Sequence, residues 1–165
     1  MKKFDFTGEV KVVFGRKLFR IRALISFGDV SEGDIGGWIE SEKNLSHDGD
    51  AWVSGNARVS GNARVSGNAR VSGDAWVSGN ARVFGDAWVS GNADYTTIKG
   101  FGSCFRNTTF FRCKDGLVRV SCGCFYGTLD EFRAKVRETH GESKKAIEYL
   151  KIADLMEYHF SEEVK

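Results

Sequence analysis

Proline is absent from the 165-residue chain, and no apolar run approaches the ~20 residues that a membrane-spanning helix needs. The lysines at the start are followed by Asp5 and Glu9, which interrupt a signal-peptide pattern. Only four cysteines occur, and without a signal they indicate free thiols in a reducing compartment, so we expect a cytoplasmic protein. A formal net charge of only +2 disfavours a polyanion-binding block, so we expect neither a nucleic acid nor a membrane as partner.

Glycine, in contrast, is abundant, with 20 of the 165 residues against about 7% in average proteins. Because glycine accepts the backbone angles of sharp turns, high glycine without proline indicates a regular array with glycine at its corners. Between residues 51 and 94 the sequence repeats every six residues, and each repeat contains Gly-Asn or Gly-Asp. The repeated apolar residues are Val53, Val59, Val65, Val71, Val77, Val83 and Val89, and Ala51, Ala57, Ala63, Ala69, Ala75, Ala81, Ala87 and Ala93.

The six-residue period has a physical interpretation. The valine lies in a short strand, Gly-Asn turns the chain, and the small alanine points inward near the corner, where a larger side chain would not fit. One repeat then makes one side of a triangular coil, so three repeats close one turn. Successive coils stack at the strand spacing of ~4.8 Å, and each coil satisfies the backbone groups of the next.

The repeat Val53-Ser54-Gly55-Asn56-Ala57-Arg58 resembles that of the hexapeptide-repeat left-handed β-helix proteins, whose pattern is aliphatic, small, any, any, small, any. The segment 33–42 and Leu45-Ser46 are similar to the beginning of YdcK-like and phage-associated β-helix proteins, often labelled polymer-forming. The resemblance covers residues 28–126 and implies a mainly β fold, a left-handed parallel β-helix with three hexads per coil. It says little about function, because one fold hosts many activities.

We expect three regions along the chain. Residues 1–34 alternate as a strand pair that caps the open end of the array, residues 35–107 form the β-helix, and residues 108–165 form a cap of a β-hairpin and two helices. The repeat frame extends back from Ala51 through Leu45 and Ile39, which we place in the inward slot of the alanines. A cap is needed because an uncovered coil offers a free edge to other chains.

Residues three repeats apart should lie one above another, which places the residue before each valine in one of three columns. The columns are Trp52, Arg70 and Trp88; Arg58, Trp76 and Asp94; and Ser46, Arg64, Arg82 and Gly100. Alternating guanidinium and indole groups suit cation–π stacking worth ~0.5–2 kcal/mol. Exposed tryptophan rows favour burial between copies, so we predict a homotrimer. Its predicted interface residues are Trp52, Arg70, Trp76 and Trp88.

Residues 108–124 are typical of a β-hairpin with a two-residue Asp115-Gly116 turn. That register predicts a core face of Phe111, Cys113, Val118, Val120, Cys122 and Cys124. The opposite face is then Phe110, Arg112, Lys114, Arg119 and Ser121. The spacing of the cysteines does not match the paired C-x₂-C pattern of a zinc site, so we expect no metal and buried free thiols.

The region from residue 99 to 137 has eight Lys and Arg against three Asp and Glu, within a chain of net charge +2. Such a local excess suits a compact anion such as a phosphate, although a solvated polar face would have the same composition. Phe110 or Trp88 would stack on a base. The predicted ligand-binding residues are Arg106, Asn107, Thr108, Phe110, Arg112, Lys114, Arg119, Ser121 and Lys135.

Two helices are predicted after the hairpin. Thr128 and Glu131 form a capping box, and Gly141 ends the first helix near His140. Ser143 begins the second helix, which runs to the region of Phe160. Its predicted apolar stripe is Ala146, Ile147, Leu150, Ala153 and Met156.

Many hexapeptide-repeat proteins are acyltransferases, which use a histidine base and a loop extruded from a coil. Here the array has no insertion, and His47, His140 and His159 lie outside the central coils, so we expect no enzyme and no cofactor. The leading hypothesis is a homotrimeric binding protein for a small anionic, nucleotide-type ligand. The resemblance to phage proteins implies an anti-defence sponge for a host signalling nucleotide in the host cytosol. The alternatives are a structural or protein-interaction scaffold and, third, an acyltransferase.

Overall fold

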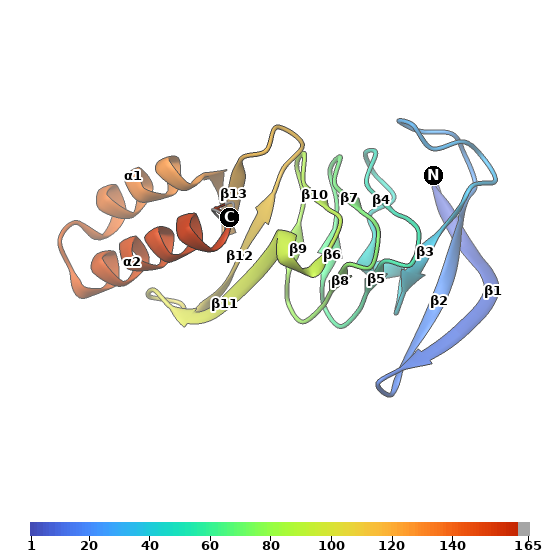
Figure 1. The fold of residues 1–165 in the computed structure, drawn as a ribbon, viewed down its shortest axis with the longest axis horizontal. Helices are drawn as coiled ribbons and strands as arrows, with labels where there is room; N and C mark the ends of the chain where they lie inside the picture. Colours follow the sequence, from blue (N-terminus) through green and yellow to red (C-terminus); the bar gives the residue numbers. More distant parts are fainter. Residues whose placement is uncertain (162–165) are drawn as a thin grey trace. The chain divides into compact units, whose positions relative to one another are not determined.

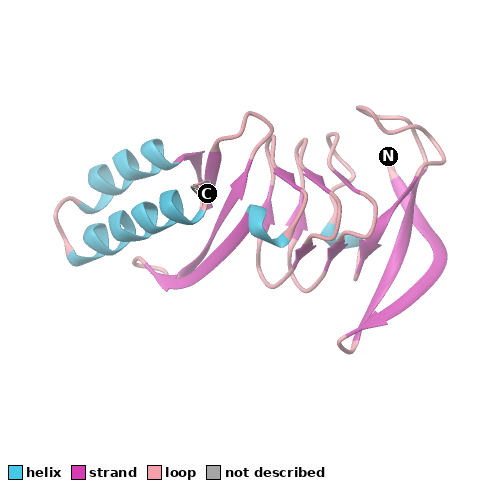
Figure 2. Ribbon diagram, viewed as in Figure 1, coloured by secondary structure: helices cyan, strands magenta, loops and turns pink. Residues whose placement is uncertain are grey.

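The computed structural model describes residues 1–161, and the chain divides into two compact units after Asn92. The first unit carries the repeats, and the second carries a four-stranded sheet and two helices (Figure 2). The expected boundary after residue 107 lies inside the second unit. The strand Tyr95–Phe101 pairs with the hairpin strands and not with the coils, so the boundary lies closer to the N-terminus than expected.

Seven two-residue strands carry the repeats within the described residues. They are β4 (Trp52–Val53), β5 (Arg58–Val59), β6 (Arg64–Val65), β7 (Arg70–Val71), β8 (Trp76–Val77), β9 (Arg82–Val83) and β10 (Trp88–Val89). Together with β3 (Ile35–Ile39) they form short parallel sheets ordered β3-β5-β8, β4-β7-β10 and β6-β9. Val53 pairs with Val71 and Val71 with Val89, so partners are three repeats apart (Figure 1). The first unit is therefore a β-solenoid.

Valine and alanine fill the interior of the solenoid. The seven valines from Val53 to Val89 and the seven alanines from Ala51 to Ala87 each expose at most 1% of their surface. β-branched valine suits the strands, and burial of each valine side chain stabilises the fold by about 1.5–3 kcal/mol. Because every coil buries the same residues against the next, stability accumulates with the number of coils.

Glycine turns the corners of the coils. From Gly55 to Gly85 the glycine of each repeat has a φ between 61° and 67°, in the left-handed region that other residues avoid. In the four strands from β4 to β7, the backbone N–H of the residue after the alanine donates to an alanine carbonyl of the next coil, as from Arg64 to Ala81 at 2.9 Å. The turns must therefore repeat closely for these bonds to align.

The first coil is two residues longer than the others. Ile39 pairs with Val59 and Leu45 with Val65, and each of these partners lies two positions beyond the usual distance of three repeats. Ile39 and Leu45 therefore occupy the valine column, and the prediction that they continue the alanine column is wrong. A Cβ atom on Gly49 would contact Gly67, which is again three repeats further on, so the two additional residues lie between Leu45 and Gly49.

The N-terminal strands β1 (Phe4–Val13) and β2 (Arg16–Ala23) form the predicted antiparallel pair. β2 also pairs with β3, so the hairpin extends the sheet that contains β5 and β8. At its tip the ring of Phe14 stacks on Trp76, with 5.7 Å between ring centroids. In the segment that follows β2, Phe27 packs edge-on against Trp52 at 5.4 Å. Two exterior tryptophans of the solenoid are thus covered by the N-terminal part of the same unit.

Buried Lys3 anchors the start of the chain to the first coil. Its ammonium donates hydrogen bonds to the carbonyls of Gly49 at 3.2 Å and Ala51 at 2.7 Å. Burial lowers the pKa of Lys3 to about 8. Nδ1 of His47 accepts a hydrogen bond from the backbone N–H of Lys3 at 3.1 Å, so this histidine links the N-terminal strand to the solenoid.

The second unit is an antiparallel sheet with two helices on one face (Figure 1). The strands are β11 (Tyr95–Phe101), β12 (Arg106–Arg112), β13 (Val118–Cys122) and β14 (Phe125–Thr128), and the helices are α1 (Leu129–His140) and α2 (Lys144–His159). Short 3₁₀ turns at Glu42–Asn44 and Asn92–Asp94 complete the described elements. The core between sheet and helices consists of Phe110, Val120, Phe132, Val136, Ala146, Tyr149, Ala153, Met156 and Phe160.

Both helices begin where the sequence predicts. Thr128 Oγ1 accepts a hydrogen bond from the N–H of Glu131 at 3.2 Å, and the Glu131 carboxylate accepts one from the N–H of Thr128 at 3.1 Å. Ser143 caps α2 in the same manner. The predicted stripe of α2 needs one correction, because Ile147 is half exposed and Tyr149 is buried in its place.

The turn between β12 and β13 is longer than predicted. Cys113 N–H donates to the carbonyl of Leu117 at 2.9 Å, so the loop comprises the three residues Lys114, Asp115 and Gly116. Gly116 has a φ of 84°, which is typical of the three-residue hairpin loop that ends in a left-handed glycine. The predicted two-residue Asp115-Gly116 turn is therefore wrong, and the strands pair one residue out of the predicted register.

This one-residue shift exchanges the faces of β12 relative to β13, since neighbouring residues of a strand point to opposite sides. Phe110 pairs with Val120 and lies in the core under the helices, whereas Phe111 pairs with Arg119. Arg112 lies on the face of Phe110, away from Arg119. The predicted core face and the predicted basic face are therefore both right for β13 and both wrong for β12.

Gly73→Ala should lower the free energy of unfolding more than Gly79→Ala. Both glycines have a left-handed φ, 61° and 65°, so alanine costs about 1–2 kcal/mol at each. At Gly73 the new Cβ would also collide with the carbonyl oxygen of Ser90 in the next coil, which we expect to add ~1–3 kcal/mol. At Gly79 nothing lies within 4 Å of that atom. Urea unfolding followed by tryptophan fluorescence measures both, and equal losses would contradict the stacking.

Candidate functional site

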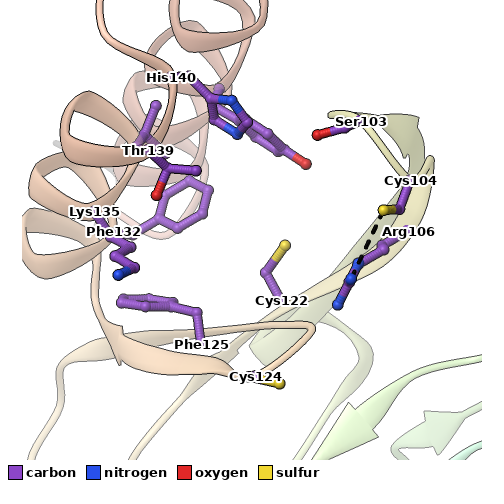
Figure 3. Close-up of a pocket in the computed structure, with 12 residues that line it drawn as sticks. Ser103, Cys104, Arg106, Cys122, Cys124, Phe125, Phe132, Lys135, Thr139 and His140 are labelled. Carbon is purple, nitrogen blue, oxygen red and sulfur yellow. Dashed lines mark hydrogen bonds between the residues drawn. The ribbon is translucent and has the colours of Figure 1, made fainter.

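A cavity of about 280 Å³ lies in the second unit, between the sheet and the helices (Figure 3). Three parts of the chain form its walls: the β11–β12 turn with the start of β12, the β13–β14 turn, and one side of α1. Tyr149 of α2 completes the lining. The residues are Ser103, Cys104, Arg106, Cys122, Cys124, Phe125, Phe132, Lys135, Val136, Thr139, His140 and Tyr149.

Arg106 is the cation of the sheet wall. Its Nη2 donates to Sγ of Cys104 at 3.7 Å, and this contact raises the pKa of the guanidinium. The guanidinium lies against Gly123, where a Cβ atom would collide with it, so glycine at this turn makes room for the arginine. None of the ion pairs within residues 1–161 includes Arg106, which leaves its charge available to an anion.

The helix wall carries Lys135, Thr139 and His140 of α1. Positions 135 and 139 are four apart and so share one side of the helix, which the capping box at Thr128 holds in place. The ammonium of Lys135 is 3.7 Å from the Glu138 carboxylate, and both side chains are more than half exposed, so this pair is weak. Lys135 therefore keeps a mobile charge at the cavity.

Aromatic rings form the deeper part of the cavity. The rings of Phe125 and Phe132 are 5.7 Å apart, and His140 stacks on Tyr149 at 5.9 Å. Burial raises the pKa of Tyr149 to about 12, so its hydroxyl stays protonated at neutral pH and can donate a hydrogen bond. The cavity thus combines two cations, hydroxyl donors and ring faces.

The exterior columns of the solenoid are the other predicted feature. Trp52, Arg70 and Trp88 pair in register as predicted, and the guanidinium of Arg58 lies 4.8 Å from the Trp76 ring centroid. Arg64 also pairs with Arg82. Because the first coil is longer, Ser46 does not continue this last column, which is a further correction.

The segment that bears these columns, residues 51–91, matches the family model described as YdcK Beta solenoid repeat in three overlapping stretches, 51–66, 63–79 and 75–91. Residues 51–91 are thus similar to the YdcK β-solenoid repeat and are called the YdcK repeat below. The resemblance that the hexads indicated is thereby confirmed for this segment. No curated protein matches the chain.

The YdcK repeat exposes fewer aromatic side chains than the sequence predicts. Trp52 has only 4% of its surface exposed, and Trp76 lies partly buried against the N-terminal hairpin. Arg70 forms an ion pair with Asp29 of the same chain. Trp88 is 51% exposed. Of the four predicted interface residues, Trp88 is the one that presents a large apolar surface.

The structure brings two of the nine predicted ligand residues to the cavity, Arg106 and Lys135. Asn107 follows Arg106 on β12 and is half-buried, outside the cavity lining. Three others expose at most 5% of their surface, which leaves a ligand no access to them. They are Thr108, Phe110 and Ser121.

The remaining three predicted ligand residues lie elsewhere in the second unit. Arg112 donates to Asp94 at 3.1 Å and to the carbonyl of Phe160 at 3.0 Å. Arg119 donates two hydrogen bonds to the Asp115 carboxylate, and these hold the pKa of Asp115 down at about 2. Lys114 is exposed in the hairpin loop. The nine residues therefore do not form one surface.

The thiols are the part of the site that sequence reasoning missed. All four cysteines are free, as predicted, but Cys104 and Cys124 are exposed, so the prediction of buried thiols is wrong for both. Cys122 is half-buried and Cys113 is buried. The contribution of Thr139 could have been predicted from the sequence, because the predicted first helix already placed Lys135 and Thr139 one turn apart.

The described residues contain no group of three or more His, Cys, Asp or Glu side chains arranged to hold a metal ion. Nor do residues 1–161 include a helix with the length and apolar character to cross a bilayer.

Phe110→Ala should lower the free energy of unfolding by ~3–5 kcal/mol, because it removes a fully buried ring from the core of the second unit. The matched control is Phe105→Ala. Phe105 is 66% exposed, so we expect a change within about 0.5 kcal/mol. Denaturant unfolding followed by circular dichroism measures both losses. Similar values for the two variants would contradict the observed register of β12.

Proposed function

We propose that this protein is a non-enzymatic binding protein that sequesters a small anionic ligand of nucleotide type in the cavity of its second unit. The observation that carries the proposal is the pair of cations on facing walls, Arg106 on the sheet side and Lys135 on α1 (Figure 3). Arg106 has the stronger role, because its guanidinium has no carboxylate partner within residues 1–161.

The chemistry of the lining supports a phosphorylated ligand. A guanidinium binds two phosphate oxygens at once, and a lysine ammonium adds a mobile positive charge. Ser103 and Thr139 offer hydroxyl donors beside these cations. Phe125 and Phe132 offer ring faces on which a base would stack. The cavity volume of about 280 Å³ is close to the smallest ligand pockets, ~300 Å³, which favours one mononucleotide over a polymer.

The biological setting in this proposal comes from the resemblance to phage-associated β-helix proteins. A phage protein that sequesters a signalling nucleotide would lower its free concentration in the host cytosol and so blunt host defence. In this function the second unit binds the ligand, and the YdcK repeat has a structural role. The acyltransferase alternative has less support, because His47 is engaged by the Lys3 N–H and the Glu42 carboxylate.

Calorimetric titration with AMP, cyclic AMP and ADP-ribose, with inorganic phosphate as reference, tests the proposal. We expect at least one nucleotide to bind with a Kd below ~100 µM. Arg106→Gln and Lys135→Gln should each weaken binding by about tenfold or more, as loss of a charge-assisted contact does. The matched control is Lys114→Gln, which removes an exposed charge outside the cavity. Absence of nucleotide binding, or equal effects of all three variants, would overturn the proposal.

We also propose that the solenoid winds left-handed and that three copies associate through its Trp88 column. The support is the six-residue repeat, the coil of three repeats and an indole that is half exposed on the outer surface. Exposed aromatic surface of this kind favours burial between protein chains. The scaffold alternative would use the same indole to bind another protein.

Native mass measurement should give three times the mass of one chain, 18.3 kDa. Trp88→Ala should shift the protein toward the single-chain mass, because it removes the apolar contact. The matched control is Tyr158→Ala on α2, which removes another exposed aromatic ring and should leave the mass unchanged. A single-chain mass for the unmodified protein would rule out the trimer and favour the scaffold.

A further inference from the structure

The four thiols of the second unit differ in their surroundings. Cys113 is buried, and burial raises the pKa of its thiol, so it is shielded and unreactive. Cys122 accepts a hydrogen bond from the hydroxyl of Thr108 at 3.2 Å and also contacts the hydroxyl of Tyr149. Only Cys104 and Cys124 are exposed among the four.

Cys104 and Cys124 differ in turn in their contact with positive charge. Arg106 Nη2 points at Sγ of Cys104 at 3.7 Å, whereas the Sγ of Cys124 points away from the centre of the cavity (Figure 3). A guanidinium beside a sulfur stabilises the thiolate, which is the nucleophilic form.

The backbone presents Cys104 to solvent at the mouth of the cavity. It lies in the turn between β11 and β12, where Gly102 and Phe105 both have left-handed φ angles of 77° and 51°. A Cβ atom on Gly102 would collide with the Tyr149 hydroxyl, so the turn passes close to the aromatic side of the cavity. The thiol of Cys104 therefore both lines the cavity and is exposed to solvent.

We propose that Cys104 is a reactive thiol and a modification site, which forms mixed disulfides with small disulfides that carry negative charge. Three observations meet at this residue: an exposed sulfur, a guanidinium directed at it, and an adjoining cavity that is lined by a second cation, Lys135. Arg106 and Lys135 favour anionic disulfides over neutral ones, because their positive charges attract the anionic reagent before exchange begins.

The chemistry is thiol–disulfide exchange. The Cys104 thiolate attacks one sulfur of the disulfide R–S–S–R, a new S–S bond forms to Cys104, and the other half leaves as the thiolate R–S⁻. The proton that Cys104 gave up on ionisation passes to solvent, and no net oxidant is consumed beyond the disulfide itself. The attached R group then occupies the cavity beside the two cations.

This modification would exclude an anionic ligand from the same space, and only that consequence rests on the proposed function. The thiol chemistry itself depends on Cys104 and Arg106 and is measured without any nucleotide. Failure of nucleotide binding would thus overturn the proposed function without affecting the proposal of a reactive thiol. An unreactive Cys104 would overturn the thiol proposal without affecting the proposed function.

The test is the reaction of the full chain with dithiobis-nitrobenzoate, an anionic aromatic disulfide, followed by the absorbance of the released thiolate and by peptide mapping. We expect the fastest phase to map to Cys104, to vanish in Cys104→Ser and to persist in the matched control Cys124→Ser. Arg106→Gln should slow this phase by about tenfold, and Arg106→Lys should restore most of the rate. With the neutral hydroxyethyl disulfide the Arg106→Gln effect should be smaller, because charge attraction of the reagent is lost.

Labelling of Cys124 as fast as Cys104 would overturn the proposal. So would an unchanged Cys104 rate in Arg106→Gln, with circular dichroism showing that the variant is folded. If Arg106→Gln proves unfolded, the unmodified protein decides the question. The rate with the anionic reagent is divided by the rate with the neutral reagent, and this ratio at Cys104 is compared with the same ratio at Cys124. A ratio no higher at Cys104 than at Cys124 would then refute it.

Discussion

The hydrogen bonds between successive coils are the constraint on which the first unit depends. The first residue of each strand from β4 to β7 donates its N–H to an alanine carbonyl of the next coil at 2.8–3.0 Å, as Arg58 does to Ala75 and Arg70 to Ala87. Such bonds align only if every coil has the same path, which requires the same corner and the same inward side-chain volume each time. Glycine with a φ near 65° supplies the corner, and alanine supplies the volume. The repetition of the sequence is thus a direct consequence of backbone pairing.

The same constraint explains what could be predicted from sequence in this unit. A period that recurs seven times fixes the strand positions, the buried valines and the columns of residues three repeats apart, because each repeat is evidence for the others. The first coil lacks that support. Leu45 and Ile39 are apolar and fit either inward column, and the two-residue insertion before Gly49 has no repeated counterpart to reveal it. The covering of Trp76 by Phe14 and of Trp52 by Phe27 was equally out of reach, since it depends on tertiary packing of non-repeating residues.

In the second unit, the helices were predictable and the sheet register was not. Caps are local signals, so Thr128 and Ser143 place both helix starts within a residue. A hairpin register, in contrast, depends on one loop residue: including Lys114 in the turn moves every partner by one. That single residue determines whether Phe110 meets a ligand or the core. The prediction of the ligand site lost Thr108 and Phe110 for this reason, and it kept Arg106 and Lys135 because their positions at the start of β12 and on α1 do not depend on the hairpin turn.

A local count of charges cannot distinguish arginines that are paired from those that are available. Arg119 is held by Asp115, and Arg112 by Asp94, which lies outside the counted stretch. Arg133 bonds Asp130 and also Asp154 and Glu157 of α2, so acids from beyond the counted stretch offset part of the positive charge between residues 99 and 137. Arg106 differs because its neighbours are thiols, which are weak acceptors and carry little charge when protonated. A guanidinium among thiols serves two chemistries at once, since it can bind an anion or stabilise a thiolate, and in a cavity of this size each excludes the other.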